Sequence, residues 1–120
     1  QAWMTNTIVA SHTVGVYVDS GCTATLEATL WGDGAWANGA NKDGSGDIKD
    51  GEIIIGDPDF IDPDHGDYHI GPTSAAKDAG LNVGVLTDID GDVRPIGPEV
   101  DIGADEAWQA LFLPLVMRDF

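Results

Sequence analysis

A stretch of the sequence carries oxygen-bearing side chains at the spacing that calcium loops use. Residues 41–52 read NKDGSGDIKDGE, with oxygen ligands at positions 1, 3 and 5, glycine at position 6 and glutamate at position 12. The candidate ligands are the side chains of Asn41, Asp43, Ser45 and Glu52 and the main-chain carbonyl of Asp47. The stretch therefore predicts a calcium site, although its flanks are not helical as in an EF-hand. A solvated turn rich in Gly and Asp is the competing interpretation.

A second cluster lies at Asp88-Ile-Asp-Gly-Asp92, which presents three carboxylates at alternate positions. A turn can direct Asp88, Asp90 and Asp92 at one cation, and calcium is again the expected ion. The alternative is structural. In that interpretation Asp88 and Asp90 accept backbone amides in an Asx turn, while Arg94 pairs with an acid such as Asp101 or Asp105.

A third acidic region, residues 57–67, invites comparison with glycosidases and polysaccharide lyases, in which carboxylates act as acid and base or hold calcium. A lyase also needs a strong base near its calcium. The five Lys and Arg residues of the chain lie mostly in turns or beside acids. We therefore expect no catalytic residues and predict that the protein is not an enzyme.

The elements that must position these clusters are short strands. Val14, Val16 and Val18 alternate with more polar residues, and Ala24, Leu26, Ala28 and Leu30 do the same, which is typical of strands with one buried face. Residues 33–52 lose this alternation and predict a long surface loop. Short strands are expected again at 52–55 and 67–70, and residues 73–79 predict one or two helical turns.

Short strands between turns, without a clear hairpin signal, favour a solenoid in which each coil pairs with the next. A small β-sandwich can produce much the same alternation and remains the alternative. We expect an all-β fold, a right-handed parallel β-helix of few coils with long acidic loops over residues 1–106. Residues 107–120 are expected to form an extended apolar arm or a cap, because Pro114 prevents an uninterrupted helix or a central strand.

The composition narrows the possible partners. The formal net charge is −16, from 21 acids against 5 Lys and Arg, which argues against nucleic acid and anionic membranes. No apolar run is long enough to cross a bilayer, so membrane insertion is not expected. Such an excess of carboxylate is relieved by salt or by bound divalent cations, which again favours calcium.

Several stretches resemble a known family. Residues 56–63 (GDPDFIDP), 66–70 (GDYHI) and 74–80 (SAAKDAG) are similar to the C-terminal signature of bacterial right-handed β-helix proteins with a choice-of-anchor Q domain. Residues 87–95 and 100–106 look like the closing elements of that family. The resemblance implies a β-helix fold and an extracellular or cell-surface location, and it implies no reaction.

These observations predict a non-enzymatic extracellular structural module. Open strand edges at the ends of a β-helix can pair with another molecule, and an apolar arm can dock on a neighbour, so end-to-end self-association into a fibre is expected. The alternatives are a carbohydrate-binding module, which would use the acidic loops and tryptophans, and the terminal fragment of a polysaccharide-degrading enzyme.

Overall fold

The computed structural model describes residues 1–108 of the chain, and the fold of this part is all-β. The strands are β1 (Ala2–Val9), β2 (Val14–Tyr17), β3 (Thr23–Gly32), β4 (Ala40–Asp43), β5 (Asp47–Asp50), β6 (Ile53–Gly56), β7 (Phe60–Asp62) and β8 (Asp67–Ile70). Two short 3₁₀ turns, Gly34–Trp36 and Pro63–His65, are the only helical elements among the described residues. The prediction of α-helical turns at 73–79 was wrong, because this segment forms hydrogen-bonded turns.

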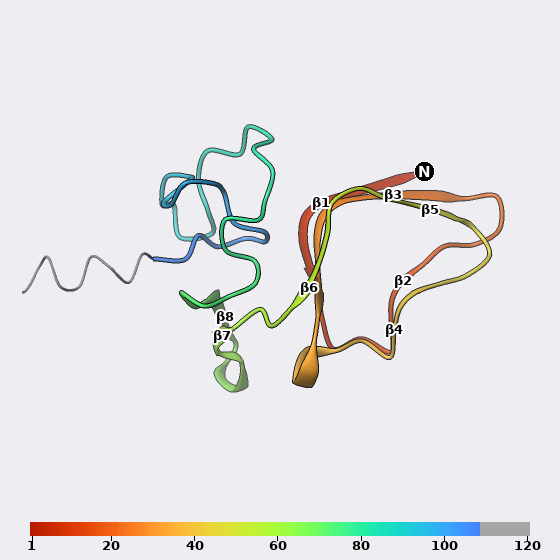
Figure 1. The fold of residues 1–120 in the computed structure, drawn as a ribbon, viewed down its shortest axis with the longest axis horizontal. Helices are drawn as coiled ribbons and strands as arrows, with labels where there is room; N and C mark the ends of the chain where they lie inside the picture. Colours follow the sequence, from red (N-terminus) through yellow and green to blue (C-terminus); the bar gives the residue numbers. More distant parts are fainter. Residues whose placement is uncertain (109–120) are drawn as a thin grey trace, which may run out of the picture.

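Parallel pairing over long sequence distances organises the first half of the chain. β3 lies between β1 on one side and β5 and β6 on the other, and β2 pairs with β4 in a second sheet. Ala2 lies beside Ala24, Thr23 beside Asp47, and Val14 beside Ala40, so the chain returns to the same sheet after 22 to 26 residues. Figure 1 shows successive passes following nearly the same path.

A sharp corner divides β1 and β3 into two straight halves (Figure 1). It lies where Asn6 and Ala28 both adopt left-handed backbone conformations, with φ of 52° and 47°. A single left-handed residue between extended ones redirects a strand, and for alanine this conformation costs roughly 1–2 kcal/mol. The corner changes which residues of β3 face the inside of the coils: Ala24 and Leu26 do so before it and Trp31 does so after it, whereas Ala28 and Leu30 face the other way.

The first core lies inside the parallel strands. It contains the buried residues Val9, Val18, Ala24, Leu26 and Trp31, with Met4, Val16, Ile48 and Ile53 packed against them. These residues come from three successive passes of the chain. Their burial holds one pass on the next, at about 25 cal/mol for each Å² of apolar surface removed from water.

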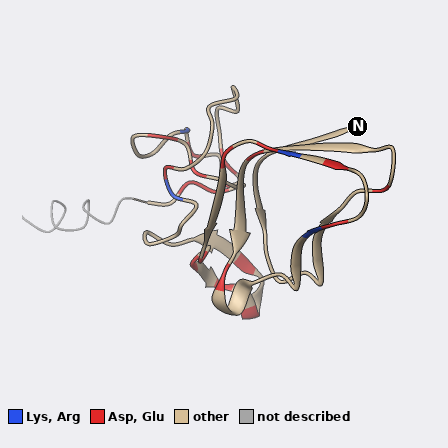
Figure 2. Cartoon of the chain, turned by 45° about the vertical axis from the view of Figure 1, so that its right-hand side comes forward, with Lys and Arg blue, Asp and Glu red and all other residues tan. Residues whose placement is uncertain are grey.

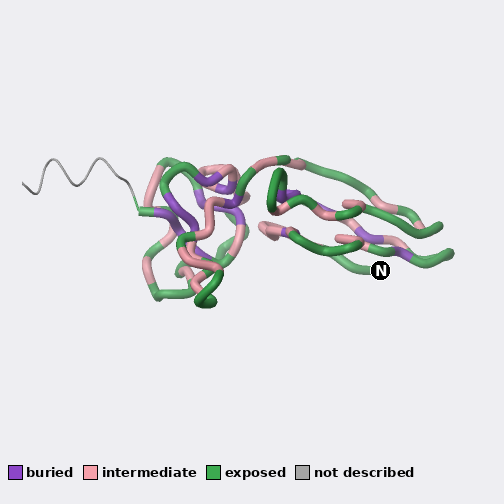
Figure 3. Tube along the Cα trace, turned by 90° about the horizontal axis from the view of Figure 1, so that it is seen from below, coloured by how far each residue is buried: buried purple, intermediate pink, exposed green. Residues whose placement is uncertain are grey.

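The second core joins the parallel strands to residues 57–108, which we call the C-terminal lobe. Ile8, Leu30 and Ile54 lie side by side in register on β1, β3 and β6 and contact buried lobe residues such as Ile70 and Ile102. Leu30, at the centre of this row, is fully buried. Figure 3 shows the lobe beside the stacked passes rather than on the end of the stack.

The lobe itself has no parallel pairing among its described residues. β7 and β8 form an antiparallel pair, and Thr87 and Val93 form an isolated antiparallel bridge. The rest consists of turns, tied to β1 where Asn6 exchanges side-chain hydrogen bonds with the main chain of Leu81 at 2.7 and 2.8 Å. The 3₁₀ turn at Pro63–His65 connects β7 to β8, a connection that the sequence pattern had not indicated.

The sequence pattern succeeded for the apolar strands and failed for the polar ones. Strands were correctly predicted near 14–18, 24–30, 52–55 and 67–70. The loop predicted for 33–52 was wrong, since β4 and β5 lie within it. The predicted apolar arm of residues 107–120 lies outside the described residues, apart from buried Ala107 and exposed Trp108. No helix of the described residues is long and apolar enough to span a membrane.

Candidate metal centre

A tight turn at residues 88–92 carries the second acidic cluster. Asp88 Oδ1 accepts hydrogen bonds from the backbone N–H groups of Asp90 (2.9 Å) and Asp92 (3.0 Å), and Asp88 N–H donates to the carbonyl of Asp92 at 3.0 Å. Gly91 has a φ of +84°, a left-handed conformation that favours glycine. This is the Asx turn of the structural interpretation, built around Asp88.

The turn is also fixed to the end of the lobe. Asp88 Oδ2 accepts the backbone N–H of Glu106 at 2.9 Å. Although partial burial opposes it, the three backbone donors from Glu106, Asp92 and Asp90 lower the pKa of Asp88 below its usual value. Asp88 is therefore a carboxylate at neutral pH, held in place before any cation arrives.

The structure brings Asp88, Asp90 and Asp92 together, with one carboxylate oxygen of each lying within 4.8 Å of the others. Carboxylate oxygens are the ligands that calcium prefers. Asp90 is exposed and Asp92 is half-buried. Figure 2 shows acidic positions in the turns of the lobe. The turn can therefore offer up to three carboxylates to a hard divalent cation.

His69 on β8 extends this cluster on the side of Asp90. Its Nε2 lies 2.8 and 2.9 Å from the two oxygens of Asp90, and its Nδ1 lies 2.5 Å from an oxygen of Asp67. Asp105 is also near, so that His69, Asp90 and Asp105 form a second group with ligand atoms within 4.8 Å of one another. Asp90 is common to both groups.

The protonation states of the two groups differ. Hydrogen bonds to Asp90 and Asp67 raise the pKa of His69 to about 9, and burial raises the pKa of Asp105 to about 6. His69 is therefore an imidazolium at neutral pH and itself acts as the cation between the carboxylates. A metal that used its nitrogen would have to displace a proton. Calcium at Asp88, Asp90 and Asp92 would displace no proton, and it would share the Asp90 carboxylate with the imidazolium.

His69 was not predicted from the sequence to belong to either acidic cluster. Its partner Asp90 lies 21 residues further along the chain, so no local pattern connects the two. The one local signal was the alternation of Asp67 and His69 on a short strand, which places both side chains on the same face. That signal indicates a local pair and does not reveal the third member.

Two buried acids near the turn, Glu106 and Asp101, have structural roles. Glu106 is buried, and its carboxylate accepts the N–H of Asp101 at 2.7 Å and lies 3.4 Å from Nε of Arg94. Arg94 also donates to the carbonyl of Gly103 at 2.6 Å. The partner of Arg94 is therefore Glu106, and the predicted pairing with Asp101 or Asp105 was wrong. The guanidinium and the Glu106 carboxylate are buried together, with side chains 5% and 0% exposed.

Asp101 has a similar structural role. It is buried, and its two oxygens accept the backbone N–H groups of Asp78 (2.7 Å) and Ala107 (2.6 Å). Burial raises the pKa of both Asp101 and Glu106. Each carboxyl group satisfies main-chain donors that would otherwise be buried without a partner, which is why these acids are tolerated inside the lobe.

The first predicted calcium loop has a different structure. Asn41 and Asp43 lie on β4, and Asp47 begins β5, which belongs to another sheet. Asn41 Oδ1 accepts a hydrogen bond from Asn38 at 2.9 Å, and Asp43 Oδ1 accepts the N–H of Gly44 at 2.7 Å. Ser45 and Glu52 are exposed. The segment is therefore divided between two strands and is not wound as an EF-hand loop.

The glycines of this segment have a packing reason. A Cβ atom on Gly44 would lie 2.2 Å from the carbonyl oxygen of Val18, and one on Gly46 would lie 2.3 Å from that of Asp19. Both positions therefore lack a side chain because the preceding pass of the chain approaches closely. The glycine that matched position 6 of a calcium loop is explained by this contact.

Comparison with known proteins adds no assignment: no family model, curated protein or solved structure matches this chain.

Proposed function

We propose that residues 1–56 are coils of a right-handed parallel β-helix and that the protein is a non-enzymatic extracellular structural module that assembles end to end. The observation that carries the proposal is the parallel pairing of β1, β3, β5 and β6 at intervals of one chain pass. Crossovers between parallel strands of one sheet are almost always right-handed. The extracellular location rests on the family resemblance.

The end formed by the first pass supports assembly. β1 and β2 each have a strand partner on one side only within the described part of the chain. Between them lies a hollow of about 360 Å³, whose lining includes the half-buried side chains of Met4 and Val16. A further coil stacked here would fill the hollow and pair with both strands, as coils do inside a solenoid.

The other end of the stack presents a complementary set of strands. β5 and β6 have their outer edges free among the described residues, and β6 carries Ile55, which is 65% exposed. Contact between this end of one molecule and the β1 end of another joins two different surfaces. Head-to-tail contacts that follow the stacking axis of the coils do not close into a ring and therefore generate a fibre.

A substitution in the hollow tests assembly directly. Met4→Lys places a charge where the next coil would stack, and Trp3→Lys is the matched control because Trp3 lies next to it on β1 and is 72% exposed. We expect the parent chain and Trp3→Lys to form filaments in negative-stain microscopy and light scattering, and Met4→Lys to remain monomeric with an unchanged circular dichroism spectrum. A parent chain that stays monomeric at all concentrations would contradict the proposal.

We further propose that calcium binds at the turn of residues 88–92. The support is the convergence of Asp88, Asp90 and Asp92 and the lowered pKa of Asp88. Isothermal titration with calcium chloride should give one site in the parent chain and a clearly weaker one in Asp92→Asn. Asp64→Asn removes an equal charge at an exposed position outside the turn and should leave calcium binding unchanged. Equal binding by all three would place calcium elsewhere.

A further inference from the structure

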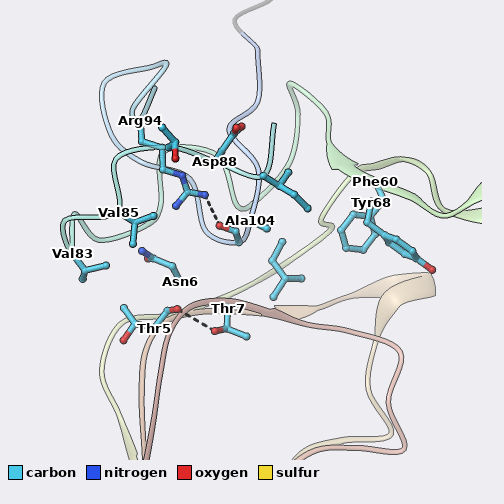
Figure 4. Close-up of a pocket in the computed structure, with 14 residues that line it drawn as sticks. Thr5, Asn6, Thr7, Phe60, Tyr68, Val83, Val85, Asp88, Arg94 and Ala104 are labelled. Atoms are coloured by element: carbon cyan, nitrogen blue, oxygen red, sulfur yellow. Dashed lines mark hydrogen bonds between the residues drawn. The ribbon is translucent and has the colours of Figure 1, made fainter. Parts of the chain in front are cut away.

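A groove runs between the first strand and the C-terminal lobe (Figure 4). It consists of two adjoining hollows of about 680 and 450 Å³, which share four lining residues: Ile8, Tyr68, Ile89 and Ala104. The larger hollow is bounded below by Thr5–Ile8 of β1 and above by the lobe, with Val83 and Val85 directed towards the strand in Figure 4. The two hollows therefore form one continuous groove between β1 and the lobe.

The larger hollow is largely apolar, and none of the residues that the structure describes covers it. Val83 and Val85 are 55% and 53% exposed, and Tyr68 and Ile89, at the junction of the two hollows, are 57% and 68% exposed. Large apolar side chains gathered at one concave site are uncommon on a soluble monomer unless something binds there. The chemistry of this part of the groove suits aliphatic and aromatic side chains.

The smaller hollow is acidic. Asp67, Asp105 and the two histidines His65 and His69 line it, while Asp90 contacts His69 and Asp62 contacts His65. The four carboxyl groups at and beside this hollow outnumber its two histidines, so a cationic side chain is favoured there. An occupant that matches the whole groove therefore carries an apolar run with a basic residue at one end.

We propose that the occupant is the chain's own C-terminal segment, residues 109–120, bound in the groove of the same molecule. Its sequence, QALFLPLVMRDF, has an apolar run from Leu111 to Met117 followed directly by Arg118. The apolar run covers Val83, Val85 and Tyr68, and Arg118 enters the acidic hollow. Pro114 suits an extended segment that forms few main-chain hydrogen bonds.

The attachment point makes binding within one molecule feasible. Ala107 is fixed by its hydrogen bond to Asp101, and Ala104, three residues earlier, lines both hollows. An extended chain advances about 3.3 Å per residue, so Leu111 reaches roughly 13 Å from Ala107 and Arg118 roughly 36 Å. A tether this short gives an effective concentration on the order of millimolar, well above that of a neighbouring molecule in dilute solution.

Cysteine pairs test this arrangement in the full chain. Cys22 is free and exposed, so Cys22→Ser is the background. Val85→Cys with Leu113→Cys joins the segment to the groove, and Tyr17→Cys with Leu113→Cys is the control, because Tyr17 is 62% exposed on β2, on the side of the coils away from the lobe (Figure 1). We expect rapid formation of a monomeric disulfide in the first pair and little in the second.

Hydrogen exchange provides a second readout that needs no new cysteine. Amides of residues 83–89 should exchange at least about tenfold more slowly in the parent chain than in Leu113→Asp with Leu115→Asp, because opening must first release the segment. Gln109→Asp adds a negative charge outside the apolar run and should keep the slow exchange. Arg118→Glu should lose part of the protection.

Three results would overturn the inference. Disulfide-linked dimers that increase with concentration would show that the groove takes the segment of a second copy. Equal cross-linking at Val85 and Tyr17, or exchange that is unchanged by the leucine substitutions, would show that the segment does not bind there. The inference does not rest on end-to-end assembly, because the groove lies on the side of the coils and assembly is measured separately.

Discussion

Replacing Leu30 by alanine is expected to cost about 3–4 kcal/mol of folding free energy. Leu30 is fully buried and lies in register between Ile8 on β1 and Ile54 on β6, where the coils meet the lobe. The substitution removes three carbon groups, a transfer cost of about 2.4 kcal/mol at roughly 0.8 kcal/mol each. A cavity penalty of about 1 kcal/mol or more is added, because neighbours on both sides hold the site open.

Urea unfolding followed by circular dichroism measures this cost, with the slope of the transition compared between variants. Ile55→Ala is the matched control, since Ile55 lies on β6 next to Ile54 but is 65% exposed. The control should lose less than about 1 kcal/mol. If Leu30→Ala loses no more free energy of unfolding than the control, then Leu30 is not part of a core that joins the coils to the lobe.

Three other predictions concern charge and backbone. In an NMR titration His69 should show a pKa near 9, well above the ordinary histidine value of about 6.5. Because the folded-state pKa is raised, the stabilising contribution of His69 is complete below about pH 6.5 and is lost as pH rises through about 9, and His69→Gln should remove this dependence. Asp105 has its pKa raised to about 6, so its contribution to folding stability is complete below about pH 3.9 and is lost as pH rises through 6. Asp105→Asn should therefore gain stability relative to the parent between about pH 4 and pH 8 in urea unfolding. Gly44→Ala should destabilise the chain clearly more than Gly21→Ala in the same assay. Both glycines have positive φ, but only at position 44 would a Cβ lie 2.2 Å from a carbonyl oxygen. Similar losses of stability in the two variants would contradict the close approach of successive passes.

The limits of sequence prediction are clearest in β3. Ala24, Leu26, Ala28 and Leu30 alternate without interruption and predicted a single buried face. In the structure the first two lie in the core of the coils, and the last two lie in the core shared with the lobe. The left-handed residue at Ala28 divides the set. Alternation predicts that a face is buried, and it does not indicate which neighbour buries it.

The polar strands show a second limit. β5 reads Asp-Ile-Lys-Asp, and of its four side chains only that of Ile48 packs into a core. The strand forms because its main chain pairs with β3, which is already in place from the preceding pass. The pattern of side chains in one segment does not show that β3 is available as a pairing partner, so the segment was predicted to be a loop.

The acidic turn at residues 88–92 could be predicted from the sequence only in part. The spacing of Asp88, Asp90 and Asp92 was sufficient to indicate that their side chains could converge, because the three are local in sequence. The contributions of His69, Asp105 and the N–H group of Glu106 depend on the folded lobe. The local half of the candidate centre was therefore accessible from sequence and the long-range half was not.

The participation of β3 in both cores has a consequence for cooperativity. Residues of the same strand bury their side chains among the coils and against the lobe, so neither part retains a complete hydrophobic interior when the other opens. The described chain should therefore melt in a single transition, with calorimetric and van't Hoff enthalpies that agree. A protease cut after Gly56 would accordingly yield two fragments that stay folded only while they remain associated.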